Sequence, residues 1–331
     1  MRYRKWIFVF GVAVLVSGCQ SKPEQTLPQQ TASASPVVNF KNAAFMSYWY
    51  AGKAELSRYR LEQARYGELR EGDAVLIFVT EDFLTDKQVK LESQPRSEVP
   101  LKFTSVLKCN FTKHFVTGVY DYTLLTSVFT PVEIGAYPHT LKTTAAVLEW
   151  CGQTFTQLNY RAPNYQVQGY SYFEAEGDAQ LSLESAVLED ELWTKLRLSP
   201  VLLPTGEFKI IPASTASRLL HRELKAESAT ADLKPYLKSE KSDSSTVFTG
   251  DSLMVYTLTY PAWQRSLKII FENKFPYRIA GWEETYLDKP GSQAPQTLTT
   301  RAVRTNTIML DYWAKKSLAD SVSRRDLGLS Y

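Results

Sequence analysis

The sequence predicts a mainly β protein, with one large curved antiparallel sheet or incomplete barrel and two or three short helices. Apolar and polar residues alternate over many short segments, as in residues 102–115, where the apolar side chains share one parity. Turn-forming residues separate these segments, and no regular alternation of strand and helix indicates a parallel α/β fold. Aromatic residues make up 13% of the chain, which is typical of strands and of packed sheets.

The alternating segments follow one another as hairpins. One pair is expected on either side of the turn-rich stretch 67–73, and another on either side of Thr117-Gly118. The expected strands are residues 54–66, 74–83, 102–115, 119–132, 141–150, 154–160, 165–173, 179–183, 207–211, 217–230, 252–260, 267–272 and 277–286, with a further candidate at 297–307. Such a sheet must close or cover its edges, so we expect a helix or two over its open side.

Three segments have the spacing of short amphipathic helices. Asn42 can cap a helix over residues 43–50. The apolar stripe from Leu188 to Leu196 predicts a second helix, whose N-terminus the acidic residues 189–191 would favour. Residues 310–318 repeat that spacing near the end of the chain.

The N-terminus has the three parts of a secretory signal. A basic head, residues 2–5, precedes an apolar run, residues 6–16, that is shorter than the ~20 residues of a transmembrane helix. The stretch LVSGC, residues 15–19, then resembles the lipobox of bacterial lipoproteins, in which the signal is cut before the cysteine. The resemblance implies a lipoprotein signal peptide over residues 1–18 and acylation, with palmitate, of Cys19. The alternative is an ordinary secretory signal with an incidental cysteine.

The residues after the lipobox predict a tether and a location. Residues 19–37 are rich in Gln, Ser, Thr and Pro and are too polar to fold, so we expect a disordered tether. Gln20 follows the cysteine where enteric-type lipoproteins retained in the inner membrane have Asp, which favours the outer membrane. We therefore expect a protein that is lipid-anchored in the cell envelope through acylated Cys19. Residues 38–331 should form a single antiparallel β domain.

Charge and motifs exclude several classes of function. Loss of the three basic signal residues, out of 38 Lys and Arg, leaves 35 against 35 Asp and Glu. No basic stripe remains for nucleic acid, so we expect no such partner. His114, His139 and His221 lie far apart in no metal-binding spacing, and no phosphate loop or nucleophile elbow is present. The sequence therefore predicts no metal, no cofactor and no catalytic residue.

Cys109 and Cys151 are the two cysteines that follow Cys19. An even pair in an oxidising compartment permits one disulfide bond. The alternative is that both are small buried residues on separate strands. The sequence leaves both interpretations open.

Two functions from different classes remain. The first is a non-enzymatic envelope protein, facing the periplasm or the cell surface, whose curved sheet binds a hydrophobic ligand or a protein partner. The aromatic residues that would face this ligand are Trp150, Phe155, Tyr256, Phe271 and Trp282. The alternative is a glycan-acting surface enzyme or carbohydrate-binding module, because glycosidases place two carboxylates around the bond that they cleave. The carboxylates for that role are Glu81, Glu283 and Glu284.

Three stretches resemble a family of uncharacterised bacterial lipoproteins: residues 48–83, TSVFTPVE at 126–133, and EWCGQTFTQLN at 149–159. Some members carry the label "septum formation inhibitor Maf". Genuine Maf proteins are cytoplasmic α/β nucleotide pyrophosphatases with an N-terminal Ser-x-Ser-Pro-Arg motif. Here Ser33-Ala34-Ser35-Pro36 is followed by Val37 and comes after a lipobox, so the sequence argues against that activity.

Residues 255–286 are similar in pattern to periplasmic domains built on a curved antiparallel sheet. The Lol lipoprotein carriers have that general architecture and hold acyl chains in its concavity. A likeness of fold does not by itself transfer a function.

Overall fold

The computed structural model describes residues 40–92, 102–237, 248–288 and 294–329. The predicted signal peptide, the lipobox with Cys19 and the tether lie outside these residues. Val38–Tyr331 forms one compact unit, and every element described below belongs to it.

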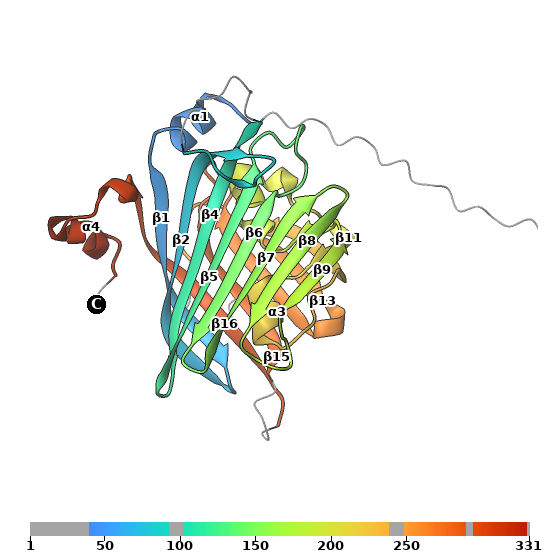
Figure 1. Ribbon diagram of the computed structural model, residues 1–331. Coiled ribbons are helices and arrows are strands. Elements are labelled where there is room, and N and C mark those ends of the chain that lie inside the picture. Colours follow the sequence, from blue (N-terminus) through green and yellow to red (C-terminus); the bar gives the residue numbers. More distant parts are fainter. Residues whose placement is uncertain (1–39, 93–101, 238–247, 289–293, 330–331) are drawn as a thin grey trace, which may run out of the picture. The chain divides into compact units, whose positions relative to one another are not determined.

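Strands dominate the described residues and join in one sheet (Figure 1). In chain order they are β1 (Ala54–Arg65), β2 (Glu68–Leu84), β3 (Val89–Lys90), β4 (Phe103–Thr117), β5 (Tyr120–Pro131), β6 (Lys142–Glu149), β7 (Gly152–Arg161), β8 (Asn164–Ser171), β9 (Ala179–Glu184), β10 (Val187–Leu188), β11 (Gly206–Ile211), β12 (Glu227–Pro235), β13 (Leu253–Tyr260), β14 (Arg265–Glu272), β15 (Ile279–Asp288) and β16 (Gln296–Leu310). The prediction of a mainly β fold is confirmed.

The sheet curls around an interior without closing. Its strand order is β10-β11-β12-β13-β14-β15-β16-β1-β2-β4-β5-β6-β7-β8-β9, and the short β3 pairs with β2. All pairs are antiparallel except β10 with β11. The two end strands, β9 and β10, follow each other in sequence after only Ser185 and Ala186, yet they do not pair. Figure 1 shows β4 to β9 in front of β13 and β15, with the interior between them.

Four short α-helices occur in the described residues, one more than the upper expectation. They are α1 (Ala43–Trp49), α2 (Glu191–Leu198), α3 (Ser214–Leu219) and α4 (Ser321–Asp326). The predicted cap of α1 is confirmed, because Asn42 Oδ1 accepts a hydrogen bond of 2.9 Å from the Phe45 amide. The helix predicted from the Leu188–Leu196 stripe is α2.

Two sequence predictions were wrong in position. The strand expected over residues 217–230 begins only at Glu227, because the preceding residues form α3 and a turn. The helix expected over residues 310–318 is reduced to a 3-10 turn at Tyr312–Ala314, since β16 continues to Leu310. A second 3-10 turn, Leu318–Asp320, leads into α4 at Ser321.

The first hairpin turn is also shorter than the predicted stretch 67–73. Tyr66 and Gly67 alone form it, with φ of 56° and 79°, and β2 begins at Glu68. Gly72 lies within β2 and marks a close approach of strands. A Cβ there would lie 2.2 Å from the carbonyl oxygen of His114 on β4, so no larger residue fits without a shift.

Helix α2 lies inside the curl and contributes to its core. Its residues Leu192, Leu196 and Leu198 are fully buried in the main hydrophobic cluster, together with side chains from the surrounding strands. The Trp193 ring packs edge-on against Phe111, with ring centroids 5.0 Å apart, and near-perpendicular to Trp282 at 5.4 Å. The concave face of the sheet is therefore largely a packed core.

A buried ion pair fixes the C-terminal end of α2. Arg197 donates two hydrogen bonds to Glu55 of β1, at 2.5 and 2.7 Å, and both side chains are 1% exposed. The guanidinium lies between the rings of Trp49 and Phe78, at 5.0 and 4.7 Å from their centroids. Burial disfavours the charge on Glu55, yet Arg197 holds the pKa of that carboxyl below its usual value. Arg197 thus joins α2 to β1 through Glu55 and to α1 through the Trp49 ring.

Replacement of one member of this pair should destabilise the whole domain. Glu55→Gln leaves Arg197 buried beside a neutral partner, so we expect unfolding to become easier by about 3–5 kcal/mol. Urea titration followed by tryptophan fluorescence measures this change. Lys234→Gln is the matched control, since its pair with Asp232 is exposed and its loss should change stability little. Equal stability of the two variants would contradict this role.

Candidate functional site

The main open cavity inside the curl lies beside the free edge strand β9. It has a volume of about 380 Å³ and lies between the inner face of β7 to β9 and α3 with the turn that follows α3. Pockets for small molecules have volumes of ~300–1,000 Å³, so this cavity is large enough for a ligand.

The strand register explains why this part of the interior stays open. Val167 of β8 pairs with Leu181 of β9, and next to them Gly169 pairs with Ala179. All four residues line the cavity. A Cβ on Gly169 would meet no atom closer than 3.8 Å, so the two small residues leave room where larger ones would pack. The exposed fraction of Leu181 is 41%, which is high for an inward-facing leucine.

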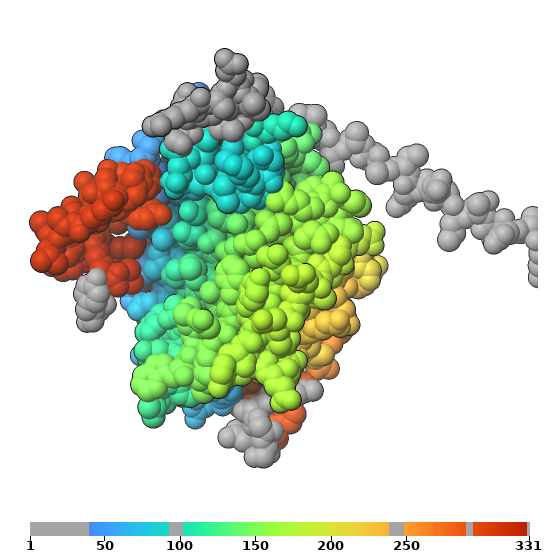
Figure 2. All heavy atoms as spheres, viewed as in Figure 1, coloured from blue at the N-terminus to red at the C-terminus, as the bar shows by residue number. Residues whose placement is uncertain are grey.

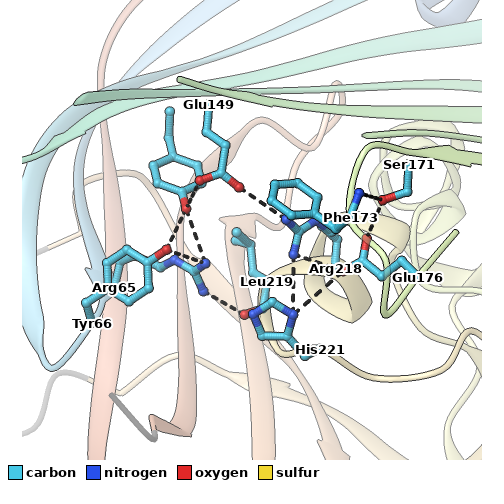
Figure 3. Close-up of polar contacts among 10 residues, drawn as sticks. Arg65, Tyr66, Glu149, Ser171, Phe173, Glu176, Arg218, Leu219 and His221 are labelled. Atoms are coloured by element: carbon cyan, nitrogen blue, oxygen red, sulfur yellow. Dashed lines mark hydrogen bonds and ion pairs between the residues drawn. The ribbon is translucent and has the colours of Figure 1, made fainter. Parts of the chain in front are cut away.

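Charged contacts hold α3 across the interior (Figure 3). Arg218 of α3 lies 3.1 Å from Glu149 of β6 and 3.0 Å from Glu176 in the loop before β9. Its guanidinium also covers the Phe173 ring, 4.4 Å from the centroid. One arginine therefore connects the helix, a strand and the β8–β9 loop, and it forms one wall of the cavity.

The same network continues across the interior to Arg65 and Tyr66, where β1 turns into β2 (Figure 3). Tyr122 donates a 2.6 Å hydrogen bond to Glu149 and shares one of 2.7 Å with Tyr66. Arg65 donates to the Leu219 carbonyl at 2.6 Å. Burial, followed by the bond to Glu149, raises the pKa of Tyr122, so this hydroxyl stays protonated. These contacts fix the end of α3 that faces the cavity.

His221 and Arg222 come directly after α3 and line the cavity. His221 has a φ of 50°, and its Nδ1 lies 3.6 Å from Glu176 Oε1. Burial and then the charges of Arg218 and Arg65 lower the pKa of His221, so the imidazole is neutral at pH 7. Arg222 lies over the Trp263 ring at 5.9 Å and has no ion pair among the described residues.

A second, much smaller cavity is enclosed by charged side chains near the start of α2. Arg265 donates to Glu284 at 2.7 Å and to both oxygens of Glu189 at 2.6 and 2.7 Å. Lys113 and Asp190 line the same space, which measures about 40 Å³. That volume suffices for a few water molecules, and it is too small for a sugar or an acyl chain.

A third hollow lies on the outer face, between β1, β2, β16 and the residues that follow β16. Leu56, Ile77 and Leu327 line it, and its volume is about 720 Å³. Figure 2 shows the C-terminal segment in red, beside the strands drawn in blue. The outer face of three central strands and one terminal segment form this groove, whereas the cavity beside β9 has walls on both sides and an organised polar end.

The structure separates the five predicted ligand-facing aromatic residues. Tyr256, Phe271 and Trp282 are at most 1% exposed and belong to the main hydrophobic cluster. Trp150 is 69% exposed in the β6–β7 turn, and Phe155 of β7 is 38% exposed. None of the five is among the residues that line the cavity beside β9. The buried three belong to the packed core instead, where Trp282 contacts Trp193 of α2.

The three predicted carboxylates do not share a cleft. Glu81 lies 3.5 Å from Lys108, Glu283 accepts a 2.9 Å hydrogen bond from Arg301, and Glu284 is buried against Arg265. Glu284 lines only the 40 Å³ cavity, so no sugar can reach it there. The geometry of these residues does not support a glycosidase.

The two remaining cysteines are free thiols. Cys109 is buried in β4, and Cys151 is exposed in the β6–β7 turn. Burial raises the pKa of the Cys109 thiol, which therefore stays protonated.

Comparisons with protein-family models, with curated proteins and with solved structures found no significant match to this chain. Among the residues that the structure describes, no helix is both long and apolar enough to cross a membrane. No cluster of three or more His, Cys, Asp or Glu side chains in those residues could hold a metal ion. The candidate site therefore rests on its own geometry.

The sequence prediction missed the polar side of the cavity. The segment predicted as a strand over residues 217–230 contains Ser217, Arg218, His221 and Arg222, which the structure places in α3 and the turn after it. The run Ser214-Thr215-Ala216 before two arginines could have indicated a short helix with a cationic end.

Asp190 should make stability depend on pH. Burial, followed by the neighbouring Glu189, raises its pKa to about 7 from 3.8. The folded state therefore holds a proton that the unfolded chain releases between pH 4 and 7, so stability falls as pH rises through that range, by up to about 4 kcal/mol. Asp190→Asn removes this contribution, and unfolding titrations at pH 4.5 and 8 should show a smaller difference than in the wild-type protein.

Asp232→Asn is the control for this experiment, because Asp232 is exposed beside Lys234 and its loss should leave the pH dependence unchanged. An Asp190→Asn variant with the same pH dependence as the wild-type protein would show that Asp190 is ionised normally.

Proposed function

We propose that this protein is a lipid-anchored cell-envelope protein that binds a hydrophobic or amphiphilic ligand in the cavity beside β9. The observation that carries the proposal is this 380 Å³ cavity, with Val167 and Leu181 on one wall and α3 on the other. It lies at an unpaired sheet edge, so a ligand can enter without disruption of the core around α2.

The likeness of residues 15–19 to a lipobox supports the location. An acylated Cys19 would attach the chain to the membrane, with the outer membrane favoured, and the polar residues after it would allow the domain to move relative to the lipid surface. The domain would then bind its apolar ligand close to a membrane, which is a source of apolar molecules.

Filling the cavity should abolish ligand binding. Ala179→Trp places a large ring in the space beside Gly169, so we expect the neutral fluorescent probe N-phenyl-1-naphthylamine to bind residues 38–331 at least tenfold more weakly. Gln180→Trp is the matched control on the same strand, since Gln180 is exposed and does not line the cavity. Fluorescence titration of the three proteins measures the affinities. Unchanged binding by Ala179→Trp, or no saturable binding by the wild-type domain, would contradict the proposal.

Cys19→Ser should release the protein from the membrane. In the lipobox interpretation this change removes the sulfur that accepts the lipid, so we expect loss of palmitate labelling and of the protein from the membrane fraction. Cys151→Ser, which changes an exposed thiol far along the chain, is the control. Retention of label and membrane association by Cys19→Ser would refute lipid anchoring.

A further inference from the structure

The polar end of the cavity contains buried groups without partners. Ser217 is 4% exposed, and its hydroxyl has no hydrogen-bond partner in the part of the chain that the structure describes. The same holds for Nε of Arg218. Both residues line the cavity beside β9. Buried polar atoms nearly always have a partner, so a polar atom held at this end of the cavity would satisfy these two groups.

Arg222 adds a charge at the same place. Its amide donates to the Ser217 carbonyl at 2.8 Å, so the turn after α3 brings the two residues together. Arg222 is among the residues that line the cavity, and its guanidinium lies over Trp263 with no carboxylate partner among the described residues. An unpaired guanidinium can bind a carboxylate or phosphate through two parallel hydrogen bonds.

The carboxylates at the cavity do not compensate Arg222. Glu176 pairs with Arg218 at 3.0 Å, and Glu223 pairs with Lys225 at 2.9 Å. The lowered pKa of His221, caused by burial and then by Arg218 and Arg65, is consistent with a positive potential at this end. The opposite wall, with Val167 and Leu181, is apolar.

We infer that the ligand of this cavity is an amphiphile with an anionic carboxylate or phosphate head, bound by Ser217, Arg218 and Arg222, while its apolar part lies along β8 and β9. The inference rests on the proposed function and specifies the chemical class of the ligand. Arg218 has two carboxylate partners already, so Arg222 is the residue that distinguishes an anionic head from a neutral one.

Calorimetric titration of residues 38–331 with dodecanoate, dodecyl phosphate and dodecan-1-ol tests the inference. These probes share one apolar chain, and the two anions separate a fatty acid from a phosphate-bearing lipid. We expect at least one anion to bind at least tenfold more tightly than the alcohol. Arg222→Gln should weaken that anion about tenfold and leave the alcohol unchanged. Lys234→Gln, an exposed change at a residue that does not line the cavity, should affect neither.

Equal affinity for the anions and the alcohol would overturn the head-group inference and leave the proposed function intact. An equal effect of Arg222→Gln on all three probes would also overturn it. Failure of every probe to bind would refute both the inference and the proposed function.

Discussion

The structure depends on the way that buried arginines hold α2 inside the curled sheet. Arg197, near the end of the helix, binds Glu55 of β1 through its two terminal guanidinium nitrogens, and Glu189, just before the helix, accepts two hydrogen bonds from Arg265 of β14. Such pairs gain little net stability over apolar packing, but loss of one partner is costly. They therefore fix where the helix lies. With α2 held at both ends, its apolar residues pack into the main hydrophobic cluster.

The open part of the interior follows from this arrangement. Helix α2 packs against β4 and β5 and does not line the cavity beside β8 and β9, where Gly169 and Ala179 replace larger side chains. The end strand β9 has no neighbour on one side, and α3 covers the space instead. Arg218 keeps α3 in place through Glu149 and Glu176. An unclosed sheet thus has a rigid core and, at its edge, a cavity with an apolar wall and a cationic end.

The alternation of apolar residues predicted most of the strands because the hairpins are half-buried and each turn interrupts the pattern. The Asn42 cap was also predictable, because a capping residue and the amide that it binds are close in sequence. The filling of the concave face was not, because period-2 alternation cannot show that Tyr256 and Phe271 belong to the same buried cluster as the leucines of α2. Glu189 and Asp190 suited a helix N-terminus in the sequence, while the structure buries both beside Arg265. The cavity depends on α3 crossing from the other end of the sheet, and no local pattern encodes that crossing.

The central claim is that a ligand enters the cavity beside β9 and leaves the packed core unchanged. Methyl NMR of residues 38–331, labelled at leucine and valine, tests it most directly during titration with dodecanoate. We expect saturable changes in the methyl chemical shifts of Val167, Leu181 and Leu224, which line the cavity. The methyl signals of Leu192 and Leu196 of α2 should stay constant. Shifts confined to Leu56 and Leu327 of the outer groove, or no shifts at all, would contradict it.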